Sequence, residues 1–197
     1  MEMSAMNQDI RIGALISGSG TNLQAIMDAC ESGQIRGNVV FIGTDNPGAA
    51  GLNKGKRLKI PTFIVDYSSI IRRFKKTPEK IKPPNDFDIN EILSKQHLFP
   101  ADADKEKIKA FFATRAVAES TLLDKMKIYP FDLLILAGFM RNLTPYFIDR
   151  VNTVPDHPRI MNIHPALLPA FPGIDGYGDT FRYGCKIGGC TVHFVDY

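Results

Sequence analysis

Short apolar runs alternate along the chain with segments of helical periodicity, and this alternation predicts the elements of the fold. Six runs have the length and composition of buried strands, namely 10–16, 39–43, 62–65, 133–137, 160–164 and 191–195. The segments between them can hold crossover helices. Strands that alternate with helices are typical of an α/β fold, here a Rossmann-like, mostly parallel sheet with helices on both faces.

The clearest predicted helix follows the first of these strands. Apolar residues recur at i, i+3, i+4 and i+7 from Leu23 to Cys30, so they form one stripe that would face the sheet. Gly33 is placed to end this helix. A second, short helix is expected after Thr144, a capping residue, with Pro145 in its first turn.

The alternation fails between residues 67 and 105. This charged segment contains four prolines and interrupts what is otherwise one domain, so we interpret about 68–105 as an insertion in a single domain spanning 1–197. So long a connection is commonly a functional lid or a mobile loop. Because no residues within it have a catalytic spacing, we favour a mobile loop over a lid or a second core.

Composition and charge exclude several classes of protein. The hydrophobic content of 44% suits an ordinary globular domain, and the formal net charge of +3 is too small to indicate nucleic-acid binding. Residues 72–82 hold six Lys or Arg and one Glu, which we interpret as a solvated stretch. No apolar run approaches the ~18 residues of a membrane span. Three cysteines without a C-x-x-C pair suit a reducing compartment and predict no metal site, so we expect a cytoplasmic protein.

A glycine-rich turn, Gly18-Ser19-Gly20-Thr21-Asn22, joins the first predicted strand to the first helix. The glycines allow close backbone approach, and the helix start offers unpaired N–H groups and the positive end of its dipole to an anion. A turn without any ligand is the alternative. Leu23 stands where a dinucleotide fingerprint needs its third glycine, although Asp45 lies at a spacing that suits a ribose contact. We therefore expect a mononucleotide-like phosphate ester rather than NAD or ATP.

Asn162 and His164 stand at the end of a predicted strand that Pro165 terminates. Period-2 alternation points both side chains to one side, and the carboxyl ends of strands are where α/β sheets bind ligands. An imidazole that exchanges a proton and an amide that stabilises an oxyanion suit acyl transfer without a covalent intermediate. The alternative is a structural histidine, which is how we interpret His97, His157 and His193. The chain has no Gly-x-Ser-x-Gly nucleophile motif.

Four segments of the chain together resemble a known family. "SGSGTNLQAI", "LAGFMRNLTPYF", "NIHPALLPAFPG" and "GGCTVHFVDY" occur in this order and are similar to the phosphoribosylglycinamide formyltransferases, folate-dependent enzymes of purine synthesis. The resemblance covers nearly the whole chain outside the insertion. The N-I-H-P-x-L-L-P motif is shared by the wider formyltransferase group. The glycine-rich motif resembles this family and differs from methionyl-tRNA formyltransferase and formyltetrahydrofolate deformylase.

The resemblance implies a role for each site residue on the substrate side and on the donor side. Gly20, Thr21 and Asn22 would bind the phosphate of glycinamide ribonucleotide. The donor, 10-formyltetrahydrofolate, would contact Arg115, Asn162 and the segment Met140, Arg141, Asn142 and Leu143, whose backbone would pair with the pterin ring. Asn142 replaces an apolar residue that is common in the family. For Arg115, a solvated helix residue is the alternative.

The resemblance also assigns the chemistry. His164 would be the general acid, and Asn162 would hydrogen-bond the formyl oxygen while the glycinamide nitrogen adds to the formyl carbon. The tetrahedral intermediate would then expel the folate nitrogen, which must be protonated. The implied partners are these two small molecules, without metal, nucleic acid or membrane; a homodimer is left open.

Two departures from the family bear on activity. Asp175 and Tyr177 replace histidines of many relatives, and the family's catalytic aspartate would lie a few residues beyond Tyr197, with the helix that follows it. The resemblance thus implies that the C-terminal part of the family domain is absent from these 197 residues and that they have low activity. A formyltetrahydrofolate hydrolase and a catalytically silent folate or nucleotide binder are the alternative functions.

Overall fold

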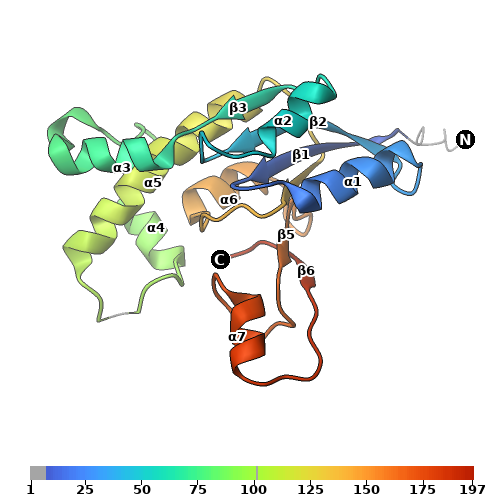
Figure 1. Cartoon of the computed structure of the whole chain (residues 1–197). Helices are drawn as coiled ribbons and strands as arrows, with labels where there is room; N and C mark the ends of the chain where they lie inside the picture. Colours follow the sequence, from blue (N-terminus) through green and yellow to red (C-terminus); the bar gives the residue numbers. More distant parts are fainter. Residues whose placement is uncertain (1–7, 101) are drawn as a thin grey trace, which may run out of the picture.

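A six-stranded sheet forms the centre of the computed structural model, which describes residues 8–100 and 102–197 (Figure 1). The strand order is β3-β2-β1-β4-β5-β6, and only β6 is antiparallel to its neighbour. The strands are β1 (Ile10–Ile16), β2 (Gly37–Thr44), β3 (Thr62–Ile64), β4 (Leu133–Leu136), β5 (Ile160–His164) and β6 (Thr191–Phe194). All six predicted strands and the mostly parallel α/β fold are confirmed, with bounds that differ by at most two residues.

Helices connect the strands. They are α1 (Thr21–Glu31), α2 (Leu52–Arg57), α3 (Tyr67–Lys76), α4 (Ile89–Lys95), α5 (Lys105–Met126), α6 (Pro145–Val151) and α7 (Gly176–Arg182), with a 3-10 turn, η1 (Pro78–Lys80). In α1 the predicted stripe is confirmed, since Leu23 and Met27 are buried and Gly33 follows the helix at a φ of 77°. Over the described ranges, no helix is both long enough and apolar enough for a membrane span.

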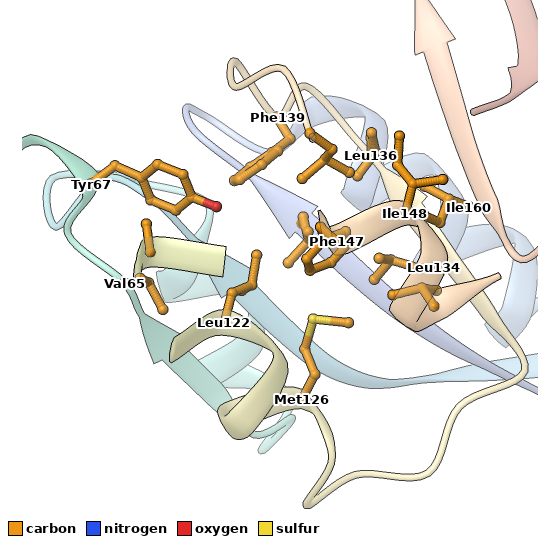
Figure 2. Packing of buried hydrophobic residues seen from close by; sticks show 14 of the residues in the cluster. Val65, Tyr67, Leu122, Met126, Leu134, Leu136, Phe139, Phe147, Ile148 and Ile160 are labelled. Carbon is orange, nitrogen blue, oxygen red and sulfur yellow. The ribbon is translucent and has the colours of Figure 1, made fainter. Parts of the chain in front are cut away.

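Two apolar clusters hold helices to the two faces of the sheet. On one face, Leu23 of α1 and Leu52 of α2 pack with Ile12 and Ile16 of β1. On the other face, the cluster joins Leu15 and other strand residues to α5 and α6; its members include Leu122, Met126, Leu134, Phe147 and Ile160 (Figure 2). Alternate residues of β1 thus face opposite layers, as the pleat of a strand requires.

Residues 67–76, 78–80 and 89–95 form helices in the segment where the sequence predicted a mobile loop without a core. Asp66 and Asp88 cap α3 and α4, because their carboxylates accept hydrogen bonds from backbone N–H groups of the first turn. Ile92 of α4 is buried with Ile108 of α5 and Tyr146 of α6. The expectation of a loop without a core was therefore wrong: the Asp caps and the apolar residues between the prolines build a small satellite cluster against α5 and α6.

Candidate active site

The order of the strands places the predicted site residues along one edge of the sheet. The chain continues from β1 outward through β2 and β3, then returns to β4 on the other side of β1. The carboxyl ends of β1 and β4 therefore form the point at which a doubly wound sheet opens a ligand crevice. The glycine turn follows β1, the segment 140–143 follows β4, and Asn162 and His164 end β5.

The glycine turn has the geometry of an anion site at the start of α1. Gly20 has a φ of 68°, and a Cβ there would lie 3.1 Å from the Cα of Gly51. The Gly20 carbonyl accepts a hydrogen bond from Lys54 Nζ at 2.9 Å, which adds a positive charge beside the helix start. No side chain caps α1, its first turn has no acidic residue, and Thr21 and Asn22 are exposed. The N–H end of the helix thus faces outward with favourable charge.

Asn162 and His164 point to the same face of β5, as the alternation predicted. Ile163 between them packs in the cluster on the α1 face, so both polar side chains point to the other face. His164 is buried, and its Nε2 lies 3.0 Å from the carbonyl oxygen of Phe171. Because a carbonyl only accepts, this Nε2 carries the hydrogen.

His193 has a contact that sequence reasoning missed. It pairs with Asn162 across the antiparallel strands β5 and β6, and its Nε2 lies 3.2 Å from the amide nitrogen of Asn162. The other ring nitrogen, Nδ1, faces the Phe194 carbonyl at 2.9 Å, so Nδ1 donates and Nε2 accepts from Asn162. The alternation of His193 with apolar residues predicted only a structural role, because a cross-strand partner is not visible in one strand's sequence.

The segment 140–143 is held at its first residue by a buried carboxylate. Ser17 Oγ accepts a hydrogen bond from the Met140 N–H at 2.8 Å, and the Ser17 hydroxyl donates to Asp45. Asp45 is 3% exposed and also pairs with Arg141 Nε at 2.5 Å. Asp45 thus holds the segment through Ser17 and Arg141. The ribose contact suggested by its spacing would compete with both partners.

A second buried carboxylate holds the other end of this segment. Glu119 of α5 is fully buried and accepts hydrogen bonds from the backbone N–H of Thr144, at 2.9 Å, and from its hydroxyl. Thr144 therefore precedes α6 as predicted, but its side chain does not cap that helix. Burial raises the pKa of Glu119 to about 8, although the hydrogen bonds from Thr144 oppose this shift. Glu119 is consequently protonated in the folded chain near pH 7.

Arg115 lies in this buried layer, one helical turn before Glu119. It is 9% exposed, which contradicts the alternative of a solvated helix residue. Its guanidinium lies over the rings of Phe111, at 4.8 Å, and Tyr67, at 5.4 Å. Nε and Nη1 of Arg115 and the Tyr67 hydroxyl are buried without a hydrogen-bond partner among the described residues. Burial lowers the pKa of Arg115, and such unpaired donors are costly unless a ligand satisfies them.

A cavity of about 500 Å³ opens beside the segment 140–143. Its lining includes Ser17 after β1, Asp45 after β2, Ser68 and Arg72 of α3, and Met140 and Arg141 after β4. Asn162 and His164 are not part of this lining, so the cavity extends the crevice on the side of β2 and α3. Asp175 and Tyr177 lie on α7, where Asp175 caps the helix and pairs with Arg182. In the described part of the chain, no three His, Cys, Asp or Glu side chains group as a metal site.

The mostly parallel sheet, the open helix start and the Asn-x-His pair at one carboxyl edge define an α/β protein whose candidate ligand site lies at the switch point of the sheet. The chain belongs to the formyl transferase family, whose model matches residues 10–197. This confirms the fold class and the family resemblance that the four sequence segments carry.

Curated relatives and solved structures agree with this family. The phosphoribosylglycinamide formyltransferase of Escherichia coli is 30% identical over 94% of this chain and 66% of that protein. The trifunctional purine biosynthetic protein adenosine-3 of Drosophila melanogaster is 31% identical over 94% of this chain, which spans only 10% of that protein. The crystal structure of glycinamide ribonucleotide transformylase 1 from Symbiobacterium toebii has a TM-score of 0.66 and 32% identity, and covers 99% of this chain and 70% of its own.

Proposed function

We propose that the chain transfers a formyl group from 10-formyltetrahydrofolate to the amine of glycinamide ribonucleotide. The observation that carries the proposal is the placement of Asn162 and His164 on the same sheet edge as an open, glycine-lined helix start, in a member of the formyl transferase family. The Escherichia coli relative is named for this activity, and the Drosophila melanogaster relative is named for purine biosynthesis. We place the reaction in the cytoplasm, without a metal.

The phosphate of the substrate is proposed to bind at Gly20, Thr21 and Asn22. The uncapped start of α1 supplies backbone N–H donors. The ammonium group of Lys54, which donates a hydrogen bond to the Gly20 carbonyl, adds positive charge beside them. A phosphate at this position would satisfy the first-turn N–H groups and gain from the helix dipole. A formyltetrahydrofolate hydrolase, which delivers the formyl group to water, has no use for this turn, and so the turn favours the transferase.

The donor is proposed to bind along the segment 140–143. The Met140 N–H donates to Ser17 Oγ at one end of this segment, and the Thr144 N–H donates to Glu119 just after its other end, so its backbone groups are fixed before a pterin arrives. Such pre-organisation saves the entropy of ordering a loop on binding. Asn142 is exposed and contributes through its backbone, which tolerates the exchange of an apolar side chain. Arg115, with its unpaired buried donors, is proposed to meet a carboxylate of the folate.

His164 is proposed to act as the general acid. Attack of the glycinamide nitrogen on the formyl carbon gives a tetrahedral intermediate, whose oxyanion the Asn162 amide stabilises. Collapse of the intermediate breaks the bond to the folate nitrogen, which takes a proton as it leaves. In the structure the Nε2–H group of His164 donates a hydrogen bond to the Phe171 carbonyl. Transfer of this proton to the leaving folate nitrogen therefore requires that the carbonyl move away.

Release of formyl groups, measured with and without glycinamide ribonucleotide, tests the proposal. The assay uses the chain in excess over the donor, so that a single slow turnover is measured. The proposal predicts release that depends on the ribonucleotide and is lost in Asn162→Ala. Equal release in both conditions would identify a hydrolase. Binding of the donor without release in either condition would identify a silent binder.

A further inference from the structure

His193 lies beside the two polar site residues of β5 although it belongs to another strand. β6 runs antiparallel to β5, and the register places His193 directly opposite Asn162. Residues that face each other across two strands point to the same side of the sheet. His193 therefore lies on the face of β5 from which Asn162 and His164 project.

The main chain fixes the hydrogen of the neutral His193 ring. Nδ1 lies 2.9 Å from the carbonyl oxygen of Phe194, the next residue along β6. Because a carbonyl only accepts, the hydrogen sits on Nδ1, and Nε2 keeps a lone pair. This lone pair faces the amide nitrogen of Asn162 at 3.2 Å. The neutral ring thus presents an acceptor, and no donor, to Asn162.

An acceptor at this position decides which way round the Asn162 amide lies. The amide nitrogen donates two hydrogen bonds and the amide oxygen only accepts, and half a turn about the last side-chain bond exchanges the two atoms. With its nitrogen toward His193, the amide uses one N–H there and keeps the second N–H for another acceptor. Turned round, it would set its oxygen against the Nε2 lone pair, and no hydrogen would lie between them. In the described part of the chain, His193 is the one hydrogen-bond partner of this side-chain amide.

We propose that His193 is a positioning residue, which holds the Asn162 amide so that its second N–H is available to the formyl oxygen. This inference rests on the proposed function, in which that amide stabilises the oxyanion of the tetrahedral intermediate. A donor stabilises an oxyanion, whereas the amide oxygen would repel it, so the two orientations of the amide differ chiefly in the rate of the chemical step. A donor that is already held in place also needs no reorganisation as the charge develops.

A merely structural histidine at this position has different consequences. His193 is half-buried on β6, which is an edge strand of the sheet. An apolar side chain of similar size suits such a strand and costs little stability there. Removal of the acceptor therefore slows the chemical step if His193 positions Asn162, and changes only the free energy of unfolding if His193 is structural.

Two variants of His193 separate these roles in single-turnover formyl transfer with the chain in excess. His193→Gln keeps an acceptor near the position of Nε2, and His193→Leu has none. We expect His193→Leu to lower the maximal rate about tenfold, less than the roughly 10² to 10³ of removing an oxyanion donor outright, and to leave the half-saturating concentrations unchanged. His193→Gln should stay within about threefold of the original rate. The control His157→Leu makes the same change at an exposed histidine outside the site and should leave the rate unchanged.

NMR spectra of the ligand-free chain test the contact without any turnover. With isotope-labelled histidine, on the alkaline side of neutrality, we expect the ring hydrogen of His193 on Nδ1. With labelled asparagine, the side-chain amide signal of Asn162, assigned by its loss in Asn162→Ala, should shift in His193→Leu.

The outcomes distinguish this inference from the proposed function. If the unaltered chain transfers no formyl group, the proposed function is wrong, and the role of His193 in it falls as well. If the chain transfers formyl groups but His193→Leu is as fast as the original, or His193→Gln is as slow as His193→Leu, the proposed function stands and the positioning role is refuted. A ring hydrogen on Nε2 would refute that role too, because the ring could not then accept from Asn162.

Discussion

The buried carboxyl group of Glu119 should make the stability of the chain depend on pH in a specific direction. Burial raises its pKa in the folded chain to about 8, from an ordinary value of 4.5. Between pH 4.5 and about pH 8, Glu119 is protonated in the folded chain and ionised in the unfolded chain. The stabilising contribution of Glu119 is therefore complete below about pH 4.5 and is lost as the pH rises through about 8. The free energy of unfolding should fall by roughly 1.4 kcal/mol per pH unit across this window.

Glu119→Gln isolates this effect. Glutamine has the shape of the protonated carboxyl group: its oxygen still accepts from the Thr144 N–H, and its amide N–H can donate to the Thr144 hydroxyl oxygen in place of the hydrogen bond that the Glu119 oxygen accepts there. This variant cannot ionise at the position. Urea unfolding of both proteins from acidic to alkaline pH should give similar stabilities near pH 5 and a variant that is more stable by roughly 4 kcal/mol above pH 8, a large share of the stability of a typical domain.

Two further variants show whether the effect belongs to this buried position. Glu119→Ala leaves the Thr144 N–H buried without an acceptor and should cost about 1 to 3 kcal/mol at every pH. Glu106→Gln makes the same chemical change on the same helix at a side chain that is 82% exposed, and should give no such pH-dependent difference. If the difference between the original chain and Glu119→Gln stays flat from pH 5 to 9, Glu119 is ionised in the folded chain and the reasoning is refuted.

Three other changes test the phosphate turn, the general acid and the core. Gly20→Val should weaken the binding of glycinamide ribonucleotide by at least about 1 to 3 kcal/mol, because the φ of 68° and the approach to Gly51 exclude a branched side chain; unchanged affinity by calorimetry would remove the turn from the site. His164→Ala should lower kcat by about 10² to 10⁴ with little change in KM, and a loss confined to KM would make it a binding residue. Phe147→Ala, at a fully buried ring of α6, should lower the free energy of unfolding by about 3 to 5 kcal/mol in urea, and a loss below about 1 kcal/mol would contradict its place in the core.

The sequence predicted the sheet well because the buried strands of a parallel sheet leave a strong local signal. Runs such as 10–16 and 160–164 are short, apolar and bounded by glycine or proline, and the stripe in α1 has clear helical spacing. The insertion was misread because its apolar residues are sparse and separated by prolines. Ile92 is buried only because Phe112 and Tyr146, from distant parts of the chain, meet it.

Only part of the candidate site could likewise be predicted from the sequence. Gly20, Asn162 and His164 could be found from local motifs, because a strand end or a helix start has a recognisable sequence. The supporting residues could not: Glu119 reaches Thr144, 25 positions away, and Ser17 reaches Met140, 123 positions away. A polar residue at position 119 resembles any helix surface residue, and its role depends on how α5 packs against the segment before α6.

Analysis of the product by mass spectrometry tests the central claim most directly. The chain, in excess, is mixed with glycinamide ribonucleotide and a donor whose formyl carbon carries an isotopic label, and the reaction is repeated with His164→Ala. The proposed function predicts that the labelled formyl group appears on the amine of the ribonucleotide and that the variant forms this product far more slowly. Label that appears only as free formate, or a variant as fast as the original chain, would contradict it.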